Sequence, residues 1–181
     1  ATEVSDYLRV LFARLGEVSC LECGRPVHAE SATSIVREAA AWPEGEVLLL
    51  LATVRLAKSL GWEEQAGHLL AAGYTRIFLA DEVRPLDPLP KLKRGTAEVQ
   101  VVVDRFTWRR GEEVRLAESC EQAFRRGEGR LELRLGERPA ERRSELWECS
   151  HCGRAAPRPE PALFSFNSPL GVCPACRGFG N

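Results

Sequence analysis

Six of the seven cysteines in this chain stand in Cys-x-x-Cys pairs, and this pattern limits the possible folds more than any other feature. A secreted protein would use such pairs for disulfides, but no stretch of the sequence resembles a secretory signal peptide. Paired cysteines without that signal are typical of metal sites, above all zinc sites. The three pairs are Cys20/Cys23, Cys149/Cys152 and Cys173/Cys176.

The two pairs nearest the C-terminus predict one zinc site. Cys149/Cys152 and Cys173/Cys176 are separated by 20 residues, and two such turns can supply four thiolates in a tetrahedral arrangement. A glycine after each pair, at position 153 or 178, would relieve crowding where the backbone turns back towards sulfur. Four protein ligands leave no open position, so we expect a structural site. Reduced buried thiols or a labile disulfide are the alternatives.

The first pair has no obvious partner in the sequence. Cys20 and Cys23 either share a metal with a pair outside this sequence or compete for the two turns near the C-terminus. Cys120 cannot complete a site, because it lies on the apolar face of a predicted helix, where we expect a core thiol.

The middle of the chain alternates predicted helices and strands. Several connections are too short for a crossover helix, so we expect an α+β fold with a mixed or antiparallel sheet and helices mainly on one face. A proline-rich loop is predicted at 84–90. Helices are predicted at 31–42, 61–72 and 112–126, and strands at 46–54, 75–80, 97–108, 131–135 and 144–148, with a turn at 81–82 that can start one further strand.

Three segments follow from this pattern. Residues 1–30 hold a helix at 2–15 and the first cysteine pair, residues 31–143 form the α+β domain, and residues 144–181 form a four-cysteine zinc-knuckle module at its root. The chain has no Met, even at position 1, and opens inside a predicted helix. We therefore expect a fragment of a longer protein.

Composition and motifs exclude several classes of function. An apolar share of 44% supports a real core, and no apolar run approaches the length of a membrane span. The net charge of −1 disfavours strong non-specific DNA binding. No phosphate loop, GxSxG or HExxH motif is present, so we expect no enzyme. A zinc-dependent DNA-binding module and a CxxC redox protein are the rivals to a protein-interaction module, although no pair clearly follows a strand of a thioredoxin-like unit.

Several stretches resemble the UvrA family of bacterial nucleotide excision repair. The most specific runs from Leu163 to Gly180 (LFSFNSPLGVCPACRGFG). Ser5–Arg14 and Glu98–Phe106 are also similar, as are Gly73–Arg76 and the loop Pro88–Leu92. The resemblance covers nearly the whole chain, and it is weakest at 55–68, where Ala57–Trp62 replaces the usual Lys-Gly-Glu-His stretch.

The resemblance implies a UvrB-binding domain flanked by zinc-supported pieces of the signature domain. The parent would be a cytoplasmic, dimeric ABC-type ATPase that recognises damaged DNA and loads UvrB. Its ATP-binding loop and signature motif are absent from this sequence, so ATP would serve only the parent. In the family, the arginines that match Arg76 and Arg105 lie at the UvrB-docking surface.

Overall fold

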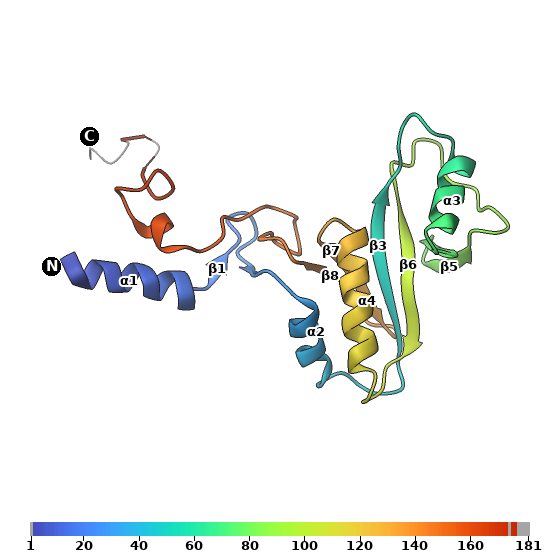
Figure 1. The fold of residues 1–181 in the computed structure, drawn as a ribbon, viewed down its shortest axis with the longest axis horizontal. Helices are drawn as coiled ribbons and strands as arrows, with labels where there is room; N and C mark the ends of the chain where they lie inside the picture. The colour runs from blue at the N-terminus through green and yellow to red at the C-terminus, as the bar shows by residue number, and fades with distance from the viewer. Residues whose placement is uncertain (1, 174, 177–181) are drawn as a thin grey trace. The chain divides into compact units, whose positions relative to one another are not determined.

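The structure is a computed structural model that describes residues 2–173 and 175–176, and its chain divides into two compact units (Figure 1). The terminal unit combines Ala1–His28 with Trp147–Asn181, and the central unit contains Ala29–Leu146. The two ends of the chain, which the sequence suggested were separate segments, thus form one unit. Position 178, one of the two glycines expected to relieve a cysteine turn, lies outside the described residues.

The central unit is built on a six-stranded sheet in the order β5-β4-β6-β3-β7-β8, and every pairing within it is antiparallel. Short connections between neighbouring strands exclude crossovers, which explains why the antiparallel alternative holds. The strands are β3 (Val47–Arg55), β4 (Arg76–Leu79), β5 (Glu82–Pro85), β6 (Glu98–Thr107), β7 (Arg130–Leu135) and β8 (Glu141–Ser144).

Three helices cover one face of this sheet, as the sequence predicted. They are α2 (Ala32–Ala39), α3 (Trp62–Ala71) and α4 (Glu113–Arg126). Side chains alternate between faces along a strand, so Leu48 and Leu50 of β3 pack against α2 and α4, while Ala52 packs with α3. These contacts form the main core of the unit.

The opposite face, here called the open face, carries a small apolar cluster. Leu49, Leu51 and Val102 are buried there, and Phe78 and Val83 pack against them. All five residues belong to strands, and no described helix contributes to this cluster. The open face is therefore the side of the sheet that a partner could reach.

A bulge in β6 decides which side chains reach the open face. The register shifts between Leu50 and Leu51, so that Leu50 pairs with Asp104 and Leu51 pairs with Val102. Val103 is left over, and both Val103 and Asp104 lie on the helix-covered face. Such an extra residue reverses the alternation beyond it, and Arg105, opposite Leu49, points to the open face.

Several boundaries differ from the sequence predictions. The helix predicted at 31–42 ends at Ala39. The last strand is Glu141–Ser144, and Glu148, which was expected to end a strand, makes only an isolated bridge with Ala155. The predicted loop at 84–90 begins later, because Arg84 and Pro85 complete β5. Proline is tolerated in β5, because this strand lies at the edge of the sheet.

The terminal unit contains α1 (Thr2–Leu15), the two-stranded hairpin of β1 (Val18–Ser19) and β2 (Pro26–Val27), and the short helix η1 (Pro161–Phe164). The apolar residues of α1 lie largely exposed, apart from a stack of Phe12 on Phe164 with ring centroids 5.7 Å apart. The small core of this unit consists of Cys20, Val27 and Cys149. None of the described helices has the length and apolar character needed to span a membrane.

Candidate metal centre and docking face

The first cysteine pair forms a tight turn at the end of β1. The Gly24 N–H donates to the carbonyl of Cys20, and the Cys20 N–H donates to the carbonyl of Arg25, both at 2.8 Å. Gly24 has a φ of +70°, a left-handed conformation that a side chain would strain. This glycine lets the chain reverse directly after Cys23, so that both sulfurs lie on one side of the turn.

The second pair repeats the same turn. The Gly153 N–H donates to the carbonyl of Cys149, and the Cys149 N–H donates to the carbonyl of Arg154, again at 2.8 Å. Gly153 has a φ of +74°. Arg154 also forms an ion pair with Glu22, which lies between the two cysteines of the first turn. The two turns are therefore matched in sequence, Cys-x-x-Cys-Gly-Arg, and in backbone geometry.

The four sulfurs of these turns lie within 4.8 Å of one another. The Sγ atoms of Cys20 and Cys152 are 3.5 Å apart, as are those of Cys23 and Cys149. Zn–S bonds of about 2.3 Å would place neighbouring sulfurs of a tetrahedron at about 3.8 Å. The four cysteines are therefore positioned to hold a metal ion, and an all-thiolate set of this size fits zinc.

Proton sharing within the cluster is uneven. The pKa of the Cys149 thiol falls to about 6, mainly because the Cys152 backbone N–H hydrogen-bonds its sulfur. At Cys152 the backbone N–H of Arg154 favours the thiolate, yet the sulfur contact with Cys20 and burial outweigh it and raise the pKa to about 11. Several thiols so close together cannot all ionise unaided, which is the situation that a bound cation relieves.

The grouping of cysteines differs from the sequence prediction. Cys149 and Cys152 were expected to meet Cys173 and Cys176, but the structure brings them together with Cys20 and Cys23. Neither Cys173, which is exposed, nor Cys176 belongs to that cluster. The sequence held a signal that spacing missed: glycine follows directly after Cys23 and Cys152, whereas Arg177 follows Cys176. Cys120 is a fully buried core thiol, as predicted, and burial raises its pKa to about 12.

Arg76 and Arg105 lie on the same open face of the central sheet. Arg76 begins β4 and shares its face with Phe78, two residues further on. Arg105 lies opposite Leu49 on β6. Both arginines are exposed, and neither has an ion pair with any residue that the structure describes. Two guanidinium groups without intramolecular partners therefore point from one sheet face towards solvent.

A groove of about 530 Å³ opens beside Arg105. On its other side Arg134 of β7 lies over the Phe78 ring, with its guanidinium carbon 4.3 Å from the ring centroid. Arg134 is held there by Glu132 at 2.8 Å and by Asp81 at 3.4 Å. The groove is lined by Val47, Leu49, Phe78, Asp81, Glu82, Val83, Arg105, Arg134 and Gly136.

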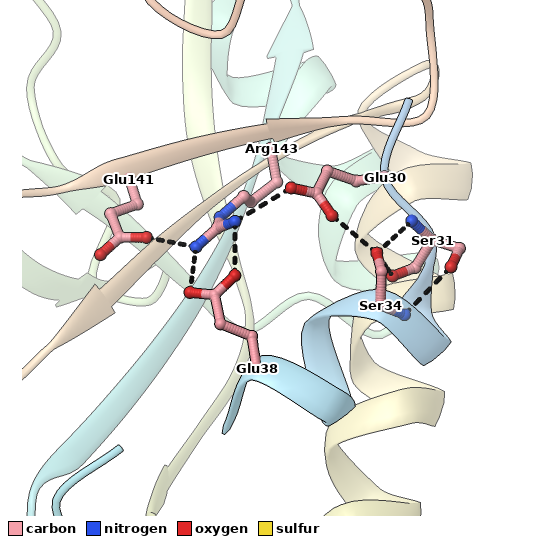
Figure 2. A network of polar contacts seen from close by, with 6 residues as sticks. All are labelled: Glu30, Ser31, Ser34, Glu38, Glu141 and Arg143. Atoms are coloured by element: carbon pink, nitrogen blue, oxygen red, sulfur yellow. Dashed lines mark hydrogen bonds and ion pairs between the residues drawn. The ribbon is translucent and has the colours of Figure 1, made fainter. Parts of the chain in front are cut away.

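A network around Arg143 joins the two ends of the central unit, and sequence reasoning missed it (Figure 2). Arg143 of β8 donates to Glu30 at 3.0 Å and forms a two-pronged contact with Glu38 of α2, at 2.6 and 2.8 Å. It also pairs with Glu141. The Glu30 N–H donates to the carbonyl of Ser144 at 2.7 Å, so the incoming and outgoing segments of the unit are bonded directly.

The same network begins helix α2. Ser31 caps the helix, its side chain accepts from the Ser34 N–H, and the Ser34 hydroxyl donates to Glu30 at 2.6 Å (Figure 2). Burial disfavours the charged guanidinium of Arg143, but its hydrogen bonds to Glu38 and Glu30 outweigh burial and raise its pKa above the ordinary value. The guanidinium therefore stays charged at all accessible pH values. Nothing in the sequence distinguishes Arg143 from the many other arginines, so sequence patterns could not predict this role.

Comparison with known proteins gives one match for the central unit and several for nearly the whole chain. Residues 30–136 match the family described as the UvrA interaction domain. The UvrABC system protein A of Thermus thermophilus is 37% identical over 186 residues, which cover 99% of this chain and 19% of that protein. The Vibrio cholerae protein is 38% identical and the Bacillus subtilis protein 34%, each over 99% of this chain and 19% of its own length. The chain thus spans about a fifth of these relatives.

Proposed function

Because this chain belongs to the UvrA family, we propose that its central unit docks UvrB through the open face and that its terminal unit is held together by a structural zinc ion. The observation that carries the docking proposal is the pair of exposed, uncompensated arginines on one rigid sheet face. The matched interaction domain, residues 30–136, falls entirely within the central unit, Ala29–Leu146.

Arginine at these two positions suits recognition of acidic groups on a partner. The guanidinium group is planar, always charged and able to bind a carboxylate through two parallel hydrogen bonds. Because Arg76 and Arg105 have no intramolecular partner among the described residues, docking does not have to break an existing ion pair. Losing one partly buried pair at an interface costs about 2 kcal/mol, or roughly thirtyfold in affinity.

Isothermal titration of the cognate UvrB protein against this chain tests the docking proposal. The double variant Arg76→Ala/Arg105→Ala should bind at least a hundredfold more weakly, and wild-type affinity should fall as salt rises. Arg110→Ala/Arg125→Ala is the matched control, because both side chains are exposed and have only surface ion pairs. Unchanged affinity in the first double variant would sink the assignment of the docking face.

The zinc proposal rests on the two matched turns. Four converging thiolates leave no open coordination position, so the ion would hold the turns together and would not act on a substrate. The segments it would join lie far apart in the chain. The apolar core around Cys20 and Cys149 is too small to stabilise them by itself. Metal binding would therefore supply much of the folding free energy of this part.

Metal analysis of the purified chain tests the ligand set. Wild type should carry zinc, and Cys20→Ser should lose most of it. Cys173→Ser should retain the ion, because residue 173 is outside the cluster of Cys20, Cys23, Cys149 and Cys152. Cys120→Ala is the control for loss of a thiol that is not a ligand. Retention of full zinc by Cys20→Ser would contradict the ligand set.

The longer protein of which this chain would be a part is proposed to be an ATPase. Membership of the family supports a DNA-damage-recognising, dimeric ATPase as the parent, of which this chain supplies the UvrB-docking part and no ATP site. The chain contains no phosphate loop of the GxxxxGK[ST] type. ATP chemistry would therefore belong to regions of the parent outside this sequence.

A further inference from the structure

We propose that the groove beside Arg105 receives one large apolar side chain of the docking partner, flanked by a carboxylate that pairs with Arg105. This inference rests on the proposed docking function and adds the chemistry of the segment that docks. It follows from three features of the groove: an apolar floor, one uncompensated cation and a preformed rim.

The floor of the groove is apolar and only partly covered. Leu49 is buried at its base, and Phe78 and Val83 are half-buried beside it. Val47, at the start of β3, is 40% exposed on the same face. An apolar side chain placed here would remove this surface from water, a gain of roughly 25 cal/mol per Å² of apolar area. A partner segment with only charged side chains would leave the floor hydrated, so it would gain no binding free energy from burial of this apolar surface.

The charges around the floor identify the second group. Arg134 is already neutralised by Glu132 and Asp81, and Glu82 pairs with Arg84 at 3.0 Å. Arg105 is the lining cation that has no counter-charge within the described part of the chain. Charge complementarity therefore calls for one carboxylate beside the apolar side chain. A basic segment would meet an unpaired guanidinium and would be rejected.

The rim of the groove is set before a partner arrives. Ala80 and Asp81, in the turn between β4 and β5, have φ values of +53° and +59°. This left-handed conformation is unfavourable for alanine, and it directs Asp81 towards Arg134 across the groove. Arg134 is in turn fixed over the Phe78 ring. A preformed groove loses little conformational freedom on binding, which favours a defined side chain over a diffuse contact.

The test introduces a carboxylate into the groove. Val47→Glu places an acid on the exposed part of the floor, where it can pair with Arg105 and adds charge to the apolar surface. Val114→Glu is the matched control: the same substitution on α4, at a valine that is 71% exposed and outside the groove lining. Thermal unfolding should show both variants folded, since each site is exposed. The partner in every titration is cognate UvrB.

The proposal expects Val47→Glu to weaken UvrB binding at least tenfold and Val114→Glu to leave it within twofold of wild type. Val47→Lys, which repels rather than occupies Arg105, should also weaken binding tenfold, because it too charges the floor. If Arg76→Ala/Arg105→Ala abolishes binding while both Val47 variants bind normally, the groove inference is overturned and the docking proposal stands.

Two further outcomes separate the inference from its premise. If wild type and all variants bind UvrB equally, both the groove and the arginine-led docking are overturned. If wild type does not bind UvrB but forms a concentration-dependent dimer that Val47→Glu disrupts, the occupant is a second copy of the chain, and the proposed partner chemistry is overturned.

Discussion

Replacing Arg143 with methionine should destabilise the central unit by about 3 kcal/mol, because it removes the guanidinium that pairs with the buried Glu30 carboxylate at 3.0 Å. The Glu30 side chain is only 9% exposed, whereas those of Glu38 and Glu141 are 44% and 50% exposed. The latter two carboxylates regain water when Arg143 is lost, and their exposed pairs contribute only about 0–1 kcal/mol each. The penalty therefore comes mainly from Glu30.

The magnitude lies at the lower end of the range for a broken buried pair, which is about 3–5 kcal/mol. The Ser34 hydroxyl still donates to Glu30 at 2.6 Å in the variant, so one carboxylate oxygen stays satisfied. For a domain of this size, a loss of about 3 kcal/mol corresponds to a fall in Tm of roughly 10 °C. Methionine keeps much of the stem packing, so the change isolates the loss of charge.

Urea titration followed by tryptophan fluorescence measures the effect, since Trp108 is buried in the core of the central unit. Arg142→Met is the control: the neighbouring residue of the same strand is exposed, and its replacement should change the free energy of unfolding by less than about 0.5 kcal/mol. A second substitution, Glu30→Leu in the Arg143→Met background, should restore part of the stability, because it removes the buried carboxylate that had lost its pair with Arg143.

The reasoning is refuted if Arg143→Met loses less than about 1 kcal/mol, the size of an ordinary surface pair. It is equally refuted if Arg142→Met loses as much, or if Glu30→Leu in the double variant lowers stability further.

Three further outcomes are expected. Burial opposes ionisation of Asp104, but hydrogen bonds from Arg115 and Ser119 outweigh it and lower the pKa of the folded state. Asp104 therefore stabilises the fold above the pKa of the unfolded carboxyl, and this contribution is lost as the pH falls through the folded pKa. In urea titrations, Asp104→Asn should lower the free energy of unfolding by about 1–2 kcal/mol at pH 7 and by little at pH 2. A strong chelator should make the terminal unit sensitive to limited proteolysis while the central unit stays protected, and equal protection of both with and without chelator would contradict a structural metal. The purified chain should neither bind nor hydrolyse ATP, and turnover above that of a mock preparation would contradict this.

Local patterns determined most of the secondary structure. The helix at 2–15 has the predicted bounds, α4 begins one residue later than predicted, and β6 is one residue shorter than predicted at each end. Helical and alternating periodicities are properties of neighbouring residues, so a sequence window contains all the information they need. The burial of Cys120 followed in the same way from its place on the apolar face of α4.

The pairing of the cysteines was decided by tertiary structure. Spacing along the chain favoured the nearer pair, Cys173/Cys176, yet the first turn closes on Cys149/Cys152 from 126 residues away. Two turns with the same geometry can form one site wherever the fold brings the two segments of the chain together. Sequence separation is therefore a weak guide, and the glycine directly after Cys23 and Cys152 was the better one.

The direction of Arg105 shows the same limit on a smaller scale. Strict alternation from Val99 and Val101, which face the helices, would place Arg105 in the helix-covered core. The bulge at Val103 reverses the alternation and turns Arg105 to the open face, beside the groove. The sequence by itself determined that this stretch is a strand and that the arginine stands near its end. Only the pairing of β6 with β3 decided which face the arginine serves, because a bulge exists only in relation to the partner strand.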